Sequence, residues 1–177
     1  MNVISEELVE ETWQEVAGFS PDLSSAEMTK FCGKQPELVA FVVEFLEDSD
    51  QQLREFATYM LFVVYRMFEK NTTKEIRKIS AEEIIKYYDS NEDLVANLEG
   101  VDDRFLNRIA KVQLAGQPYV MKYVLEVLMD IPEEEKEEEE KQLVAMRDDD
   151  IGYLFLLLKT VVDVLDYATQ SDQKWMT

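Results

Sequence analysis

QPELVAFVVEFLED, residues 35–48, occurs again 82 residues later in the chain as QPYVMKYVLEVLMD, residues 117–130. The two stretches share six of their fourteen residues, and four further positions exchange one apolar residue for a similar one. A glycine precedes each copy, at Gly33 and Gly116. The match predicts that the chain contains a tandem duplication, so its second half should repeat the folding plan of the first.

Both copies are predicted to be buried helices that begin at their prolines. A proline fits the first turn of a helix, where its missing N–H would have no intrahelical partner. The residues after Pro36 and Pro118 are apolar nearly all round the predicted helix, a pattern typical of a helix enclosed by its neighbours. With five glycines and four prolines in 177 residues, the chain offers few turns, which favours an all-α fold.

Further helices are predicted from apolar spacing and from residues that favour helix ends. Apolar residues at helical spacing indicate three of them, over 5–17, 50–70 and 151–169. Ser24 with Glu27, and Ser80 with Glu83, match the capping box, so each serine is predicted to open a helix. A short helix is also predicted to begin at Ser90.

These elements predict a single domain over 1–177, a compact multi-helix bundle made of two duplicated helical units. The units are placed at about 24–70 and 103–169, with a linker over 72–100. The simplest packing relates them by a pseudo-twofold axis, with the two proline-initiated helices face to face. A short α-solenoid is the alternative, although two long repeats leave little room for the stacking that stabilises solenoids.

The charge of the chain limits its partners. It carries 38 acidic and 18 basic side chains, a formal charge of −20. That charge repels phosphate backbones and anionic lipids, so nucleic acid and membranes are not expected as partners, whereas basic proteins are favoured. The first residues turn acidic at once and show no secretory signal, which predicts a cytoplasmic location.

The residue types also limit the chemistry. Histidine is absent, which excludes Ser-His and Cys-His couples and every metal site that needs a histidine ligand. Cys32 is the one cysteine, so an intramolecular disulfide is impossible. The five glycines form no phosphate-binding loop. No catalytic or cofactor-binding residue is therefore predicted.

Short carboxylate patterns resemble the magnesium ligands of all-α nucleotide pyrophosphohydrolases, which present E-E-x-x-E on one helix and E-x-x-D on the next. Residues 6–10 and 134–138 fit the first pattern, and residues 163–166 come near the second, with aspartate in place of glutamate. Magnesium prefers such hard oxygen ligands. The resemblance implies a magnesium-dependent hydrolase as an alternative, and solvated helix faces in a glutamate-rich chain explain the same patterns.

Glu44 and Glu126 occupy equivalent positions inside the two apolar helices. If both faced the pseudo-axis, they would form a carboxylate pair with raised pKa values or a metal site. The other interpretation places each on the one exposed edge of its helix, or beside a basic residue.

A run of acidic residues, 133–140, contains seven glutamates and one lysine. It lacks the alternating ligands and central glycine of an EF-hand loop. It reads either as a solvated helix or as a surface that docks a basic partner, with these candidate contacts: Glu133, Glu134, Glu135, Glu137 and Glu138.

These observations predict a non-catalytic acidic helical protein that acts by binding another protein, as an adaptor or a homo-oligomer. Eight tyrosines at helical spacings fit a core or a subunit interface better than a cofactor site. Two alternatives stay open. One is the magnesium-dependent hydrolase, and the other is an acidic decoy or chaperone-like binder that covers a basic protein surface.

Overall fold

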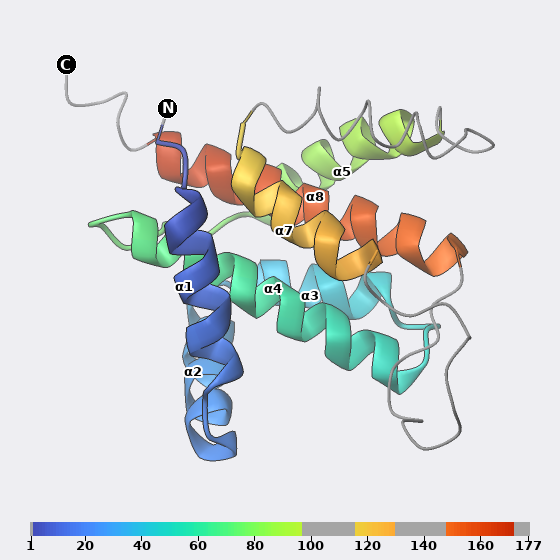
Figure 1. Cartoon of the computed structure of the whole chain (residues 1–177). Helices are drawn as coiled ribbons and strands as arrows, with labels where there is room; N and C mark the ends of the chain where they lie inside the picture. Colours follow the sequence, from blue (N-terminus) through green and yellow to red (C-terminus); the bar gives the residue numbers. More distant parts are fainter. Residues whose placement is uncertain (1, 97–115, 130–147, 172–177) are drawn as a thin grey trace.

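The computed structural model describes residues 2–96, 116–129 and 148–171. Within these ranges the chain is helical and contains no strand (Figure 1). The helices are α1 (Glu6–Ala17), α2 (Pro21–Lys34), α3 (Pro36–Phe45), α4 (Gln51–Asn71), α5 (Ala81–Ala96), α7 (Pro118–Met129) and α8 (Asp148–Ser171). None of these helices is both long enough and apolar enough to span a lipid bilayer.

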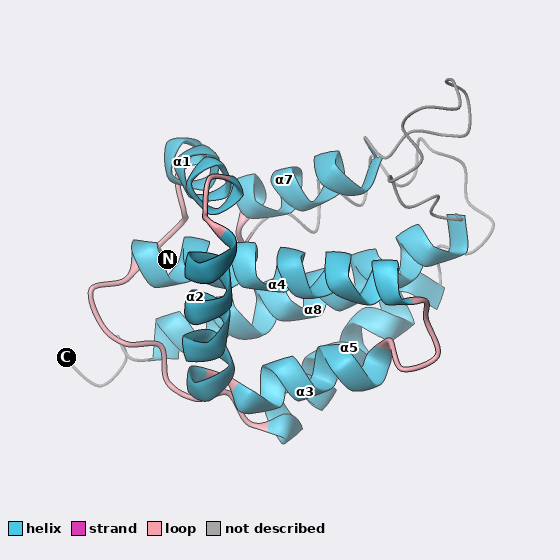
Figure 2. Ribbon diagram, turned by 90° about the horizontal axis from the view of Figure 1, so that it is seen from below, coloured by secondary structure: helices cyan, strands magenta, loops and turns pink. Residues whose placement is uncertain are grey.

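The helices form three layers, which Figure 2 shows edge-on. The long helices α4 and α8 contact each other in the middle layer. The pair α1 and α7 covers one side of this layer, and the pair α3 and α5 covers the other. The helix α2 crosses the layers at one end and leads into α3.

The core lies along the middle layer. In α4 the six residues from Met60 to Tyr65 are all buried, and in α8 the buried run extends from Leu156 to Val162. A helix that is enclosed on every side needs apolar residues all round, and both sequences supply them with few exceptions. The prediction of a compact all-helical bundle is confirmed for the described residues.

The proline-initiated helices are buried as predicted, but they are not face to face. Leu38 and Val42 of α3, and Val120 and Val124 of α7, are at most 1% exposed. The α4–α8 layer lies between the two helices. Each is enclosed because it packs on both long helices and on one further helix, α3 on α5 and α7 on α1.

Two predicted helix starts are wrong. Ser24 lies inside α2, which begins at Pro21, and the hydroxyl of Ser20 accepts a hydrogen bond from the N–H of Leu23. Proline in the first turn and serine before it are sufficient to start the helix earlier. Ser90 lies inside α5, which continues because Asn91 is buried and its amide donates hydrogen bonds to α8.

Two buried glutamines fasten extended segments to the ends of the proline-initiated helices. The side chain of Gln35 accepts a hydrogen bond from the N–H of Ile79 (3.1 Å) and donates to the carbonyl of Arg77 (2.9 Å). The side chain of Gln117 accepts from the N–H of Ile4 (3.0 Å) and donates to the carbonyl of Asn2 (3.2 Å). Each segment leads directly into a helix, so the two glutamines hold the chain in place just before α5 and α1.

Candidate functional site

Four aromatic side chains from three helices contact one another on the α3–α5 side of the molecule. The ring of Tyr88 in α5 lies 5.8 Å from Phe41 and 5.6 Å from Phe45, both in α3. The ring of Tyr153 in α8 lies 6.1 Å from Phe45. The planes meet at steep angles in all three contacts, the edge-to-face arrangement that aromatic pairs prefer. These four residues, with Ile85, are called the α3–α5 aromatic surface below.

This surface is open to solvent at two of its members. Tyr153 is 59% exposed and Ile85 is 55% exposed, while Phe41, Phe45 and Tyr88 are half-buried. Ile85 precedes Tyr88 by three residues and therefore occupies the same side of α5. Single exposed apolar residues are common, so what distinguishes Tyr153 is its contact with the half-buried ring of Phe45.

Acidic residues border the α3–α5 aromatic surface. Glu44 is exposed on α3 between Phe41 and Phe45, and Asp89 and Glu92 are exposed on α5. Burial raises the pKa of the Tyr88 hydroxyl, and the nearby carboxylate of Glu92 raises it further. A negative charge that acts on this phenol also acts on any ligand that covers it.

The opposite side of the molecule holds a closed aromatic contact. Trp13 of α1 stacks on Tyr123 of α7 at 6.5 Å between ring centres, with an angle of 16° between the planes. The hydroxyl of Tyr123 donates to the sulfur of Met60 at 3.9 Å, and burial raises its pKa far above the usual range. Here Tyr123 is partly buried and packs against the core, and Trp13, itself 36% exposed, covers its outer side, so this contact stabilises the fold.

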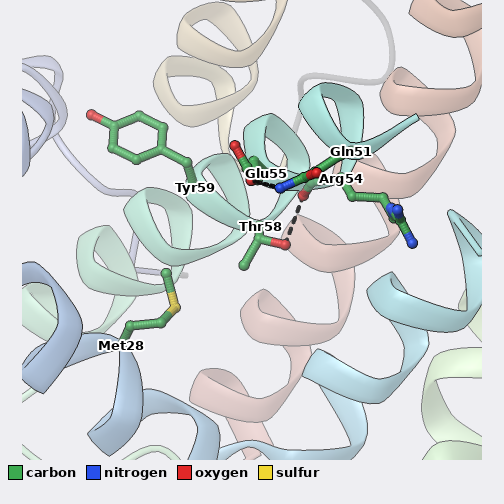
Figure 3. A pocket seen from close by; sticks show the side chains of 6 residues that line it. All are labelled: Met28, Gln51, Arg54, Glu55, Thr58 and Tyr59. Carbon is green, nitrogen blue, oxygen red and sulfur yellow. Dashed lines mark hydrogen bonds between the residues drawn. The ribbon is translucent and has the colours of Figure 1, made fainter. Parts of the chain in front are cut away.

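A shallow depression of about 280 Å³ lies where α2 meets the first half of α4 (Figure 3). Three of its polar side chains form local hydrogen bonds: the amide of Gln51 donates to Glu55 at 2.8 Å, and the hydroxyl of Thr58 donates to the carbonyl of Arg54. Figure 3 shows that the lining side chains point in different directions and converge on no common point. The arrangement suits neither proton transfer nor nucleophilic attack, because both need groups aimed at one atom.

A network of ion pairs holds α1, α2 and α4 together. The guanidinium of Arg66 in α4 donates to Glu15 and to Glu69, both at 2.9 Å, and Lys34 at the end of α2 donates to Glu69 at 2.7 Å. A hydrogen bond from Lys70 is the main reason that the pKa of Glu15 is lowered. Each charge in the network is matched by a partner, so the network acts as a structural joint.

A second polar cluster joins α5 to α8. Lys159 is 4% exposed and its ammonium donates to Asp163 at 2.7 Å. The amide of Asn91 donates to the same carboxylate at 2.9 Å and to the hydroxyl of Thr160 at 3.2 Å. A buried charge requires such pairing, and here every named group has a partner.

The residues of the magnesium pattern are placed on separate parts of the fold. Glu6 and Glu10 are exposed on α1, and the carboxylate of Glu6 forms an ion pair with the ammonium of Lys122 at 2.6 Å. The aspartates of α8 are bound within the protein, Asp163 as described above and Asp166 to the amide of Gln117 at 2.7 Å. The described ranges contain no group of three or more carboxylates or cysteines placed to bind a metal ion. The pattern at 134–138 lies outside the described residues.

Glu44 and Glu126 are both exposed, Glu44 on α3 and Glu126 on α7. The fold does not bring them together, since the α4–α8 layer separates their helices. A metal site at either residue stays a prediction. The acidic candidates Glu133, Glu134, Glu135, Glu137 and Glu138 lie outside the described residues.

Little in the sequence pattern indicates the α3–α5 aromatic surface. Phe41 and Phe45 lie in a helix that is apolar nearly all round, so both were expected to be enclosed. The tyrosines of α5 and α8 were compatible with a core or an interface. What distinguishes the two is the crossing of α3, α5 and α8, in which Tyr153 and Ile85 stay more than half exposed.

Comparison of the chain with protein-family models, with curated proteins and with solved structures found no match.

Proposed function

We propose that this is a non-catalytic acidic helical protein that acts by binding another protein through the α3–α5 aromatic surface. The observation that carries the proposal is the contact of Phe45 with both Tyr88 and Tyr153 at an edge where Tyr153 is more than half exposed. Three helices hold these rings in place, so a partner meets a surface that is already ordered.

The chemistry of this surface fits protein recognition. Tyrosine and phenylalanine are enriched at the centres of protein interfaces, where a few residues supply most of the binding energy. Covering the exposed parts of Tyr153 and Ile85 would contribute roughly 1–2 kcal/mol for each side chain. The half-buried rings behind them add apolar contact at little cost in side-chain entropy, because their neighbours already restrict them.

We also infer that the duplication includes the helices that precede the two proline-initiated helices, so that α1 and α5 are counterparts. The dipeptide Ile-Ser precedes both helices, at 4–5 and at 79–80. Ile4 and Ile79 are both buried, and each serine hydroxyl accepts a hydrogen bond from the N–H three residues later. The glutamines Gln35 and Gln117, equivalent in the repeated stretch, bind these two segments.

Packing relations support the same inference. If Ile4 corresponds to Ile79, then Trp13 corresponds to Tyr88. If Gln35 corresponds to Gln117, then Phe41 corresponds to Tyr123. The contact of Trp13 with Tyr123 and the contact of Tyr88 with Phe41 therefore join corresponding positions of the two copies. On this basis the two copies extend over about 4–71 and 79–171, which is wider than the units 24–70 and 103–169. Hydrogen exchange at the amides of Ile4 and Ile79 tests the relation, because counterpart clamps predict that both are protected.

Affinity capture with the full chain tests the proposed function. The exchange of two exposed residues, Tyr153→Ser with Ile85→Ser, removes the two most exposed apolar side chains of the surface and leaves the charge unchanged. A matched control is Tyr119→Ser with Leu23→Ser, which also removes one exposed tyrosine and one exposed aliphatic residue, on α7 and α2. We expect a stoichiometric protein partner to be lost with the first variant and kept with the control. Equal recovery with both variants would contradict the proposal.

A further inference from the structure

The α3–α5 aromatic surface combines exposed rings with carboxylates on two helices. Glu44 follows Phe41 by three residues, and Asp89 and Glu92 follow Tyr88 by one and by four. All three carboxylates are exposed. They border the rings, so a ligand that covers Tyr88 or Phe45 also comes within reach of negative charge.

Basic residues are scarce on α3 and on the described part of α5. On α3 the exposed charged residues are all acidic, Glu37 and Glu44, and two more follow at Glu47 and Asp48. On α5, Lys86 is the one basic residue within the described helix. The chain as a whole carries a net charge of −20.

The negative charge around the rings distinguishes between two possible occupants of the surface, a second copy of this chain and a basic partner. In a symmetric dimer the same patch meets itself, so the carboxylates around the rings would face carboxylates. Like charges across an interface oppose association unless they are neutralised. A basic partner gains from the same carboxylates.

Arginine fits the combination better than lysine. A guanidinium stacks on the face of a tyrosine or phenylalanine and donates two parallel hydrogen bonds to a carboxylate, whereas an ammonium acts as a point charge. Tyr88 and Glu92 lie on the same side of α5, one turn apart, so one guanidinium can reach both kinds of group.

We propose that the α3–α5 aromatic surface binds an arginine-rich segment of a different protein, one that also carries aliphatic side chains, and that it does not bind a second copy of this chain. The inference rests on the proposed function and names the partner class for the same surface. Aliphatic side chains of the partner cover Tyr153 and Ile85, and its arginines stack on Tyr88 and pair with Glu44, Asp89 and Glu92.

The test uses the full chain and short synthetic peptides of leucine and arginine, with matched peptides that carry lysine or glutamine in place of arginine. We expect the arginine peptide to bind most tightly, by fluorescence anisotropy. Raising the salt from about 0.1 M to about 1 M shortens the screening length from about 10 Å to about 3 Å, and should weaken this binding strongly.

Variants of the chain distinguish the surface from the general charge. Tyr153→Ser with Ile85→Ser should weaken the arginine peptide about tenfold or more, and the control Tyr119→Ser with Leu23→Ser should not. A second pair keeps the net charge equal. The triple exchange Glu44→Gln, Asp89→Asn and Glu92→Gln should weaken binding, and the exchange of three exposed glutamates on α1 should not: Glu7→Gln, Glu10→Gln and Glu11→Gln.

Four results would overturn the inference. They are equal binding of the arginine and glutamine peptides, equal binding by the surface variants and their controls, no binding of any peptide, or a dimer in sedimentation that Tyr153→Ser with Ile85→Ser dissolves. If the glutamine peptide binds and the same variant abolishes its binding, the surface is still a protein-binding site and only the basic character of the partner is wrong. If affinity capture finds no partner that depends on this surface, the proposed function itself fails.

Discussion

The pair α1–α7 and the pair α3–α5 cover opposite sides of the same α4–α8 layer, and each pair places an aromatic contact between its helices. On the α1–α7 side, Trp13 covers Tyr123, whose hydroxyl is directed at Met60 in the core. On the α3–α5 side, Tyr88 contacts the half-buried rings of Phe41 and Phe45, and the contact continues from Phe45 outward to Tyr153. A similar helix pairing therefore holds a phenol that reaches the core on one side, and on the other side a group of rings that ends at Tyr153, which is 59% exposed.

The largest expected loss of stability follows the exchange of Gln35, whose side chain holds the segment that leads into α5. Gln35→Ala leaves the buried N–H of Ile79 and the carbonyl of Arg77 without their partner, and we expect it to lower the free energy of unfolding by about 2–4 kcal/mol. Gln117→Ala removes the partner of the buried N–H of Ile4 and the donor to Asp166, so we expect a loss of similar size. Denaturant unfolding measures both values, and a loss below about 1 kcal/mol for either exchange would contradict the role of that glutamine in holding its segment.

The next largest loss of stability is expected when the contact of Trp13 with Tyr123 is removed. Trp13→Ala uncovers Tyr123, so we expect a loss of about 1–2 kcal/mol in the free energy of unfolding. The phenol of Tyr123 should then become accessible, which its ultraviolet absorbance in an alkaline titration reports. If Trp13→Ala leaves both stability and the titration unchanged, the contact is not closed.

A smaller effect concerns the start of α5 and depends on pH. The guanidinium of Arg77, with Ser80, lowers the pKa of Glu83 from its usual 4.5 to about 2. A lowered pKa in the folded state stabilises the protein above the unfolded-state value, and the stabilisation is lost as the pH falls from about 4.5 towards 2. Glu83→Gln should therefore lower stability by about 1 kcal/mol at neutral pH, and the difference from the unmodified chain should shrink across this window.

The corresponding position in α1 provides the control for that measurement. The N–H of Leu8 donates to Ser5 as the N–H of Glu83 donates to Ser80, but Leu8 has no charge. Leu8→Gln should show no such dependence on pH between about 4.5 and 2. A parallel pH profile for the two exchanges would show that the pair of Arg77 with Glu83 is not the cause.

The smallest effect on stability is expected at the exposed ring. Tyr153→Ala should change the free energy of unfolding by no more than about 0.5 kcal/mol, because most of the side chain already faces water. Thermal unfolding of Tyr153→Ala and Trp13→Ala under the same conditions compares the two contacts directly. A loss at Tyr153 as large as that at Trp13 would mean that the α3–α5 aromatic surface is structural.

The residues explain which features could be predicted from the sequence. The apolar runs after Pro36 and Pro118 were sufficient to place two buried helices, because burial of a helix depends on its own composition. The continuation of α5 past Ser90 was not predictable, since it depends on the hydrogen bonds of Asn91 to a helix about 70 residues away.

The candidate site was less accessible to prediction than the fold. Phe45 and Val42 look alike in a sequence pattern, but Val42 is buried against the core and Phe45 is half-buried beside Tyr88. That difference arises from how α3 crosses α5 and α8. Ring contacts between residues as distant as Phe45 and Tyr153 also leave no periodic signal, so only the three-dimensional arrangement reveals them.

The parts of the chain before and after the connection between Asn71 and Ser80 pack on each other, which has a consequence for cleavage of the backbone. The helix α7 of the second part contacts α1 of the first, and α3 of the first part contacts α5 of the second. A protease cut in the connection between Asn71 and Ser80 would leave two fragments that are interlocked on both sides. The nicked protein should therefore migrate as one particle in native conditions and separate only when it unfolds.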